Sequence, residues 1–185
     1  CQLTDMDVSN ASLYDGHTAA SEAAVIALNS RRNTDTILYS ETLHPATKAV
    51  LATYFLGTDI QLEQIPQQQG TTSLNALDSM LDDSVAGVIV QSPNFYGFLE
   101  DYSDFSELLK RNNSLFIISS NPMSLGALKS QGQWGADIAI GDTQPFGLPM
   151  SFGGPSVGYI AAKEEFLRKM PGRIVGETLD QDGKR

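Results

Sequence analysis

The chain has very little of the chemistry that cross-links and metal clusters need. Its 185 residues include one cysteine, Cys1, and two histidines. A single cysteine cannot form an internal disulfide, and so few thiols and imidazoles offer no metal-ligand cluster. We therefore expect no metal site and a reducing, cytoplasmic setting.

Long hydrophobic runs and basic residues are also scarce. No apolar stretch approaches the roughly 20 residues that cross a bilayer, and the first residues lack the basic and hydrophobic segments of a secretion signal. The 22 acidic residues outnumber the 12 basic ones, which gives a formal net charge of -10. Such a charge repels nucleic-acid phosphates and anionic lipids. Neither a nucleic acid nor a membrane is expected as the main partner.

Familiar catalytic signatures are missing too. No serine lies in a nucleophile-elbow pattern, no catalytic triad can be assigned, and a phosphate-binding Walker lysine is absent. The glycine-containing segment 153–158 is followed by an apparent strand rather than a helix, which argues against a dinucleotide loop. No lysine occurs between Lys129 and Lys163. The sequence therefore identifies no catalytic residue.

What is present suffices for one folded unit. With 41% hydrophobic residues, the chain can bury one substantial core but is short for two domains. We predict a single domain over residues 1–175, followed by an acidic boundary segment over 176–185. Because the chain begins with Cys1 rather than methionine, we expect it to be a portion of a longer subunit.

Helical and strand patterns alternate along this domain. Helices are predicted over 18–28 and over 121–128. Another is predicted from Pro45 to about Gly57, with Val50, Leu51 and Tyr54 facing inward, and a short one from Ser73, with Leu74, Leu77 and Leu81 facing inward. A fifth helix is predicted to begin at a capping pair formed by Asp104 and Glu107. Strands are predicted over 36–40, 60–65, 85–91, 115–118, 137–140 and 157–162. The order predicts an α/β fold with a doubly wound, mostly parallel sheet and a reversed edge strand near Val157.

Ligands of such sheets usually meet the loops at the carboxyl ends of the strands. Four segments lie there: 14–18, 91–97, 119–122 and the loop 141–155. The candidate residues are Tyr14, Asp15, Gly16 and Thr18 in the first segment, Asn94 and Tyr96 in the second, and Thr143, Gln144, Gly153 and Gly154 in the last. The first segment either presents helix N-terminal amides to an anion or forms an ordinary N-cap, which its residue types favour. Asn94 and Tyr96 suit a pocket lining, although a turn fixed by Pro93 and Gly97 explains them equally well.

The two histidines give a weaker signal than these loops. His17 belongs to a first helical turn and His44 precedes Pro45. Surface or capping roles explain both of them better than a catalytic pair does.

Five motifs, taken together and in this order, resemble one family. They are Asn10-Ala-Ser-Leu-Tyr-Asp-Gly16, Thr18-Ala-Ala-Ser-Glu-Ala23, Gln91-Ser-Pro-Asn-Phe-Tyr-Gly97, Gly141-Asp-Thr-Gln-Pro-Phe-Gly147 and Ser151-Phe-Gly-Gly-Pro155. Through nearly its whole length the chain is similar to glycine cleavage system P-proteins, specifically to subunit 1 of the split bacterial glycine dehydrogenase (decarboxylating) or the N-terminal half of the fused enzyme. The resemblance implies the large domain of the type I pyridoxal phosphate (PLP) dependent transferase fold.

The resemblance also implies a heteromeric enzyme that decarboxylates glycine and passes its aminomethyl group to the lipoyl arm of H-protein. PLP supplies the electron sink, and its lysine belongs to the partner, either subunit 2 or the C-terminal half. In this chain Gln144-Pro145 stand near the position of the His-Lys pair, and Ser119-Ser120-Asn121 replace the aspartate that would hold the pyridine nitrogen. We therefore expect a noncatalytic, degenerate copy without PLP, in which the 141–155 loop and the 14–18 turn either face the partner's active site or close the chain's own vacated pocket.

Two other functions stay open at this stage. One is a stand-alone PLP-dependent lyase or aminotransferase that uses Lys129 or Lys163. Simpler roles exist for both lysines, a solvated helix end for Lys129 and the entry to the last helix for Lys163. The other function is a noncatalytic scaffold or binding domain.

Overall fold

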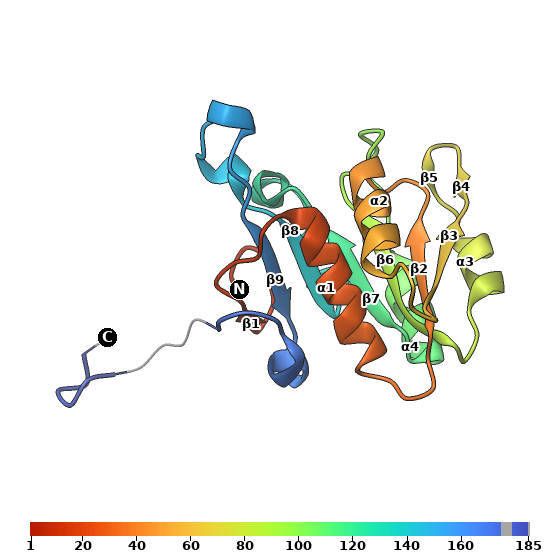
Figure 1. Ribbon diagram of the computed structural model, residues 1–185, viewed down its shortest axis with the longest axis horizontal. Coiled ribbons are helices and arrows are strands. Elements are labelled where there is room, and N and C mark those ends of the chain that lie inside the picture. Colours follow the sequence, from red (N-terminus) through yellow and green to blue (C-terminus); the bar gives the residue numbers. More distant parts are fainter. Residues whose placement is uncertain (175–178, 185) are drawn as a thin grey trace.

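The computed structural model of the chain describes residues 1–174 and 179–184. In those ranges a seven-stranded sheet has the order β1-β9-β8-β7-β6-β2-β3 (Figure 1). The strands are β1 Val8–Ser9, β2 Thr36–Ser40, β3 Gln61–Ile65, β6 Val85–Gln91, β7 Leu115–Ser119, β8 Ile138–Asp142 and β9 Gly158–Ala162. A separate two-stranded ribbon joins β4 Gln67–Gln68 to β5 Thr71–Thr72.

The sheet is mostly parallel, as the alternating pattern predicts. The pairs β3–β2, β2–β6, β6–β7 and β7–β8 are parallel, whereas β9 runs antiparallel to β8. The expected reversed strand after Val157 is therefore confirmed. Its expected place at the edge is wrong, because β1 pairs with the outer side of β9 through Val8 and Ser9. Two residues are too few to show a periodic pattern, so no sequence signal predicts this strand.

Helices cover both faces of the sheet (Figure 1). They are α1 Gly16–Leu28, α2 Pro45–Tyr54, α3 Leu74–Met80 and α4 Ser103–Asn112, with short 3-10 turns η1 Pro122–Gly126, η2 Gln144–Phe146, η3 Ser151–Gly153 and η4 Glu164–Lys169. The alanine-rich side of α1 packs with Leu51 of α2 on one face. Residues of α3 and α4 pack with alternate residues such as Val88 and Val90 on the other. Because both faces are buried, β6 is apolar up to its last residue, Gln91.

Several local expectations are wrong where neighbouring groups compete. Tyr54 of α2 is 43% exposed rather than inward, and its hydroxyl donates to Glu22, so the inner face of α2 is formed by Thr47 and Leu51. The Asp104–Glu107 capping pair does not form, since α4 begins at Ser103 with no side-chain cap. There, Ser103 donates its backbone N–H and its hydroxyl to Asp101 instead.

The helix expected over 121–128 is only the five-residue turn η1, although Asn121 does cap it by accepting from the Met123 N–H. Lys129 accordingly lies beyond any helix, with its Nζ 4.1 Å from the centre of the Trp134 ring. The predicted boundary segment 176–185 falls in part outside the described residues. The division into one domain and a boundary segment stays a prediction. No helix within the described ranges is long and apolar enough to cross a membrane.

Candidate functional site

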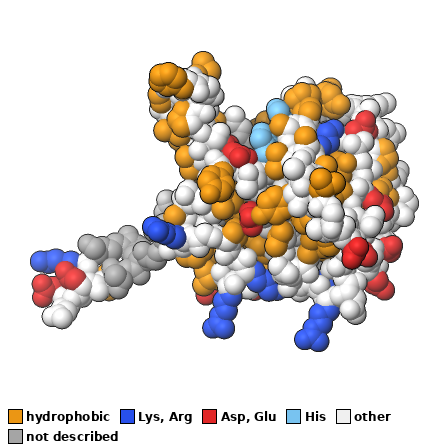
Figure 2. Space-filling model, in the orientation of Figure 1, with side chains coloured by type: hydrophobic (Ala, Val, Ile, Leu, Met, Phe, Trp, Pro, Cys, Tyr) orange, Lys and Arg blue, Asp and Glu red, His pale blue; other side chains and the backbone are white. Residues whose placement is uncertain are grey.

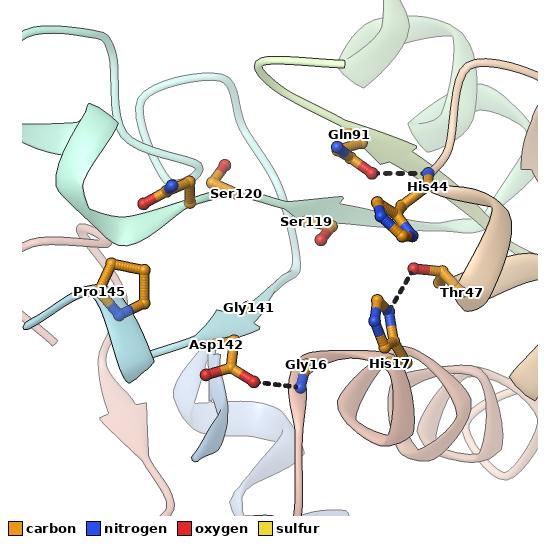
Figure 3. Close-up of a pocket in the computed structure, with 11 residues that line it drawn as sticks. Gly16, His17, His44, Thr47, Gln91, Ser119, Ser120, Gly141, Asp142 and Pro145 are labelled. Atoms are coloured by element: carbon orange, nitrogen blue, oxygen red, sulfur yellow. Dashed lines mark hydrogen bonds between the residues drawn. The ribbon is translucent and has the colours of Figure 1, made fainter. Parts of the chain in front are cut away.

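A cleft of about 220 Å³ opens at the carboxyl ends of β6, β7 and β8, where the N-termini of α1 and α2 meet them (Figure 3). Eleven residues line it: Gly16, His17, His44, Thr47, Gln91, Ser119, Ser120, Asn121, Gly141, Asp142 and Pro145. Figure 2 shows the histidines in a hollow beside a projecting lobe. This is the position at which a doubly wound sheet usually presents a ligand.

The structure brings the two histidines together, 27 residues apart in the chain. Their ring centres are 5.2 Å apart, and the ring of Phe95 meets His44 edge-on at 5.1 Å. His17 shares a 2.9 Å hydrogen bond with the Thr47 hydroxyl. His44 Nδ1 accepts from the Ala46 N–H at 3.1 Å, so neutral His44 carries its proton on Nε2. Partial burial, and then the charge of His17, lower the pKa of His44.

The capping interpretation of His44 is thus confirmed, and the pairing of the rings was missed. Sequence distance hides it, because each histidine stands at the start of a different helix. Only the parallel packing of α1 beside α2 places both starts at one edge of the sheet.

Asp142 connects the N-terminus of α1 to the base of the loop after β8. Its Oδ2 accepts from the Gly16 N–H at 3.1 Å, and its Oδ1 accepts from the N–H groups of Gln144 at 2.8 Å and Val157 at 3.2 Å. The Cβ that an alanine would add at position 16 would lie 3.1 Å from Asp142 Cβ. Only glycine therefore fits comfortably at this close approach. Sequence reasoning missed Asp142, although an aspartate that ends a strand before a Gly/Pro-rich loop is a usable signal.

Residues of the 14–18 turn mostly serve the helix itself. Asp15 accepts from the Thr18 N–H at 2.7 Å and from the Thr18 hydroxyl at 2.9 Å. Burial raises the pKa of Asp15, but the hydrogen bonds from Thr18 and the nearby charge of His17 outweigh it and lower the pKa overall. Tyr14 points to solvent. The ordinary N-cap interpretation is confirmed, and Gly16 is the residue of this turn that lines the cleft.

Asn94 does not line the cleft and instead fixes a turn. Its carboxamide oxygen accepts from the N–H groups of Tyr96 and Phe98, while its Nδ2 donates to the Gly70 carbonyl and to Glu100. Tyr96 is exposed at the tip. The structure thus gives Asn94 the turn-forming role rather than a place in the cleft.

The remaining candidates belong to the loop after β8. Thr143 donates its hydroxyl to the Val157 carbonyl, and Gln144 donates its side-chain amide to the Leu148 carbonyl. Gln144, Gly153 and Gly154 line a neighbouring hollow that shares Asp142 and Pro145 with the main cleft. The ten candidates therefore do not converge on one cavity, and their role toward a partner stays a prediction.

One polar cluster near the site was not foreseen at all. Glu100 is only 6% exposed, and its carboxylate accepts from the Thr42 hydroxyl at 2.9 Å, Asn94 Nδ2 at 2.7 Å and the Thr72 N–H at 2.7 Å. Ser40 adds its hydroxyl between those of Thr42 and Thr72. No local sequence pattern reveals the role of Glu100, because its partners are up to 58 residues away.

The cleft does not fit PLP as a covalent cofactor. No lysine occurs among its lining residues, and serine hydroxyls stand in place of a carboxylate at the end of β7, where Ser119 is the last residue and Ser120 follows. Lys163 pairs with Asp137, the residue just before β8. Asp137 is roughly 16 Å along the strand from Asp142, at about 3.3 Å per residue, so Lys163 is anchored far from the cleft. Lys129 lies over Trp134 and does not line the cleft either. Nor do the described residues hold a cluster of three histidine, cysteine or acidic side chains able to bind a metal ion.

Comparison with solved structures defines the class of fold first. A putative O-acetylhomoserine (thiol)-lyase of Campylobacter jejuni, which carries a pyridoxyl-lysine, matches 91% of this chain and 39% of its own with a TM-score of 0.68 and 13% identity. At that identity the match shows the fold alone. The chain shares the α/β fold of that enzyme, with a mostly parallel sheet, which confirms the expected fold class.

The sequence comparisons then give the family. All of residues 1–185 match the family described as glycine cleavage system P-protein, and the chain belongs to it. A crystal structure of glycine decarboxylase (P-protein), in inhibitor-bound form, matches 99% of this chain and 41% of its own, with a TM-score of 0.90 and 42% identity. Two curated relatives, each a probable glycine dehydrogenase (decarboxylating) subunit 1, are 52% identical in Bacillus cereus (strain B4264) and 51% identical in Bacillus mycoides (strain KBAB4) across the whole chain. The chain spans 41% of their length.

Proposed function

We propose that this chain is the large-domain portion of subunit 1 of a glycine dehydrogenase (decarboxylating), the half that supports catalysis without performing it. The observation that carries the proposal is 52% identity across all 185 residues to relatives described as that subunit. In this proposal the companion subunit 2, or C-terminal half, holds PLP. Glycine is the substrate, and lipoyl H-protein accepts the aminomethyl group. The cytoplasmic location expected from the sequence is part of the same proposal.

The residues of the cleft support the noncatalytic role. PLP, where it is bound, supplies an electron sink for carbanion chemistry, and that chemistry needs a lysine anchor and a carboxylate beside the pyridine nitrogen. The cleft instead presents the hydroxyl groups of Ser119 and Ser120 and the imidazole of His44, whose Nδ1 accepts from the Ala46 N–H. These groups form hydrogen bonds, but none of them makes the covalent anchor. The chain's own contribution is then to hold loops in place.

The loop 141–155, called the projecting loop below, supplies a surface for a partner. Four large apolar side chains are exposed on it: Phe146, Leu148, Met150 and Phe152. Phe152 is 111% exposed and has the left-handed backbone angles φ 54° and ψ 33°, which cost a bulky residue energy. An apolar surface of this kind typically marks a protein contact. We propose that this loop and the 14–18 turn face the partner's active site in a heteromer.

Reconstitution tests the function. Subunit 1, subunit 2, lipoyl H-protein and PLP are mixed, and carbon dioxide release from carboxyl-labelled glycine is measured with each component omitted in turn. The proposal predicts no turnover without either subunit. Full turnover by subunit 2 and H-protein alone would exclude a supporting role. Assembly with subunit 2 without any effect on glycine turnover would instead favour a simple scaffold.

A further inference from the structure

The carboxylate of Asp142 lies where the N-terminus of α1 points into the cleft (Figure 3). Three backbone N–H groups from separate places in the chain converge on it, those of Gly16, Gln144 and Val157. The first turn of the 13-residue helix α1 has unpaired N–H groups and the positive end of the helix dipole. A helix N-terminus in this setting attracts a phosphate or carboxylate. Here the protein's own side chain occupies the position.

A second observation also points to a ligand of this kind. Ser120 lines the same cleft, and its hydroxyl forms no hydrogen bond within the described part of the chain. That hydroxyl is not among the buried polar atoms that lack a partner, so it is open to the cleft. The cleft thus places an accessible side-chain donor beside the three backbone donors that Asp142 occupies.

The electrostatic balance of the cleft nevertheless opposes a phosphate. None of its lining residues is a lysine or an arginine, and Asp142 already brings one negative charge. Its Oδ1 and Oδ2 use all three converging N–H donors, so an incoming dianion would meet repulsion and no free backbone donor there.

We propose that Asp142 is a resident anion that closes the α1 terminus to phosphate groups and so excludes phosphate-bearing cofactors from this cleft. Replacing it with a small neutral residue frees the three N–H donors and turns the cleft into a phosphate site. The inference extends the proposed function, because it explains why this half holds no PLP. Its test does not depend on glycine turnover.

Titrations of the full chain with inorganic phosphate, and separately with PLP, test the inference. Asp142→Ala should bind inorganic phosphate at least tenfold more tightly than the wild type, with saturable NMR shifts of the Gly16 and Val157 amides and a melting temperature that rises with phosphate. Asp142→Asn keeps the side-chain volume and should gain less. Asp59→Ala removes the same charge at an exposed position and should behave as the wild type.

Three results would overturn the inference. They are saturable phosphate shifts of the Gly16 amide in the wild type, a folded Asp142→Ala chain with no gain in phosphate affinity, and an equal gain in Asp59→Ala. If Asp142→Ala fails to fold, Asp142→Ser and the wild-type titration decide the question. Full glycine turnover in a reconstitution that omits this chain would contradict the proposed function alone, so the two failures are distinguishable.

Discussion

Removing the carboxylate of Glu100 should lower the free energy of unfolding more than removing any other single acidic side chain near the cleft. Its two oxygens accept from three separate segments, through Thr42, Asn94 and Thr72. None of the ion pairs found among the described residues involves it. Three donors, rather than a cation, therefore compensate for its burial.

The magnitude follows from those three contacts. A hydrogen bond to a charged group contributes about 1.5–3 kcal/mol, and each buried donor left without a partner costs about 1–3 kcal/mol. Water that enters the space offsets part of this sum, so we expect Glu100→Ala to lower the free energy of unfolding by about 3–5 kcal/mol. Glu100→Gln keeps one acceptor oxygen but places an amide NH₂ near a donor. We expect it to cost about 1–3 kcal/mol.

Urea unfolding of each variant measures these differences, provided that two spectroscopic probes give the same transition. Glu107→Ala is the matched control, because Glu107 is an exposed acid on the following helix and should change stability by less than about 0.5 kcal/mol. Faster hydrogen exchange of the Tyr96 amide should accompany the loss, since Asn94 holds that N–H. A cost below about 1 kcal/mol for Glu100→Ala would refute the account of this cluster.

The other predictions concern the histidine pair, the close approach of Gly158 to the backbone of Asp15, and the projecting loop. Because the pKa of His44 is lowered below 6.5, the unfolded chain binds more protons at this residue, and the free energy of unfolding should fall as pH drops below about 6.5. Urea titrations should show a weaker dependence of stability on pH for His44→Asn, which can still cap its helix. An unchanged pH dependence would show that His44 is not its cause. Gly158→Ala should cost about 1–3 kcal/mol, because its Cβ would lie 2.2 Å from the Asp15 carbonyl oxygen, whereas Gly126→Ala, with open space around it, should be nearly neutral in the same urea assay. Phe152→Ala should weaken binding to subunit 2 about tenfold or more in calorimetry while leaving the melting temperature of the isolated chain unchanged; unchanged affinity would remove that side chain from the contact.

Regular elements were predictable where one local rule dominated. The apolar run over β6 and the alanine spacing of α1 gave nearly their true bounds, because burial on both faces and small-residue packing leave direct marks on the sequence. Predictions failed where a neighbour competed for the same backbone group. At the start of α4, Asp101 accepts the Ser103 N–H and the helix already begins at Ser103, so Asp104 lies inside the helix and cannot cap it.

The site was less predictable than the fold, because it depends on chain segments that meet only in three dimensions. His17 and His44 face one another across two helix starts, and Glu100 and Asp142 receive donors from loops far away in sequence. The sequence did place the cleft at the carboxyl ends of the strands, and Gly16 among its lining residues. The pairing of the remaining loops is a consequence of topology, which no local pattern encodes.

The most direct test of the central claim is to locate PLP after reduction with borohydride in the reconstituted complex. Peptide mass spectrometry of both subunits identifies the lysine that carries the pyridoxyl group. The account predicts one stoichiometric adduct on the companion subunit and none on this chain. A stoichiometric adduct on Lys129 or Lys163 would contradict it and would make this chain a PLP enzyme in its own right.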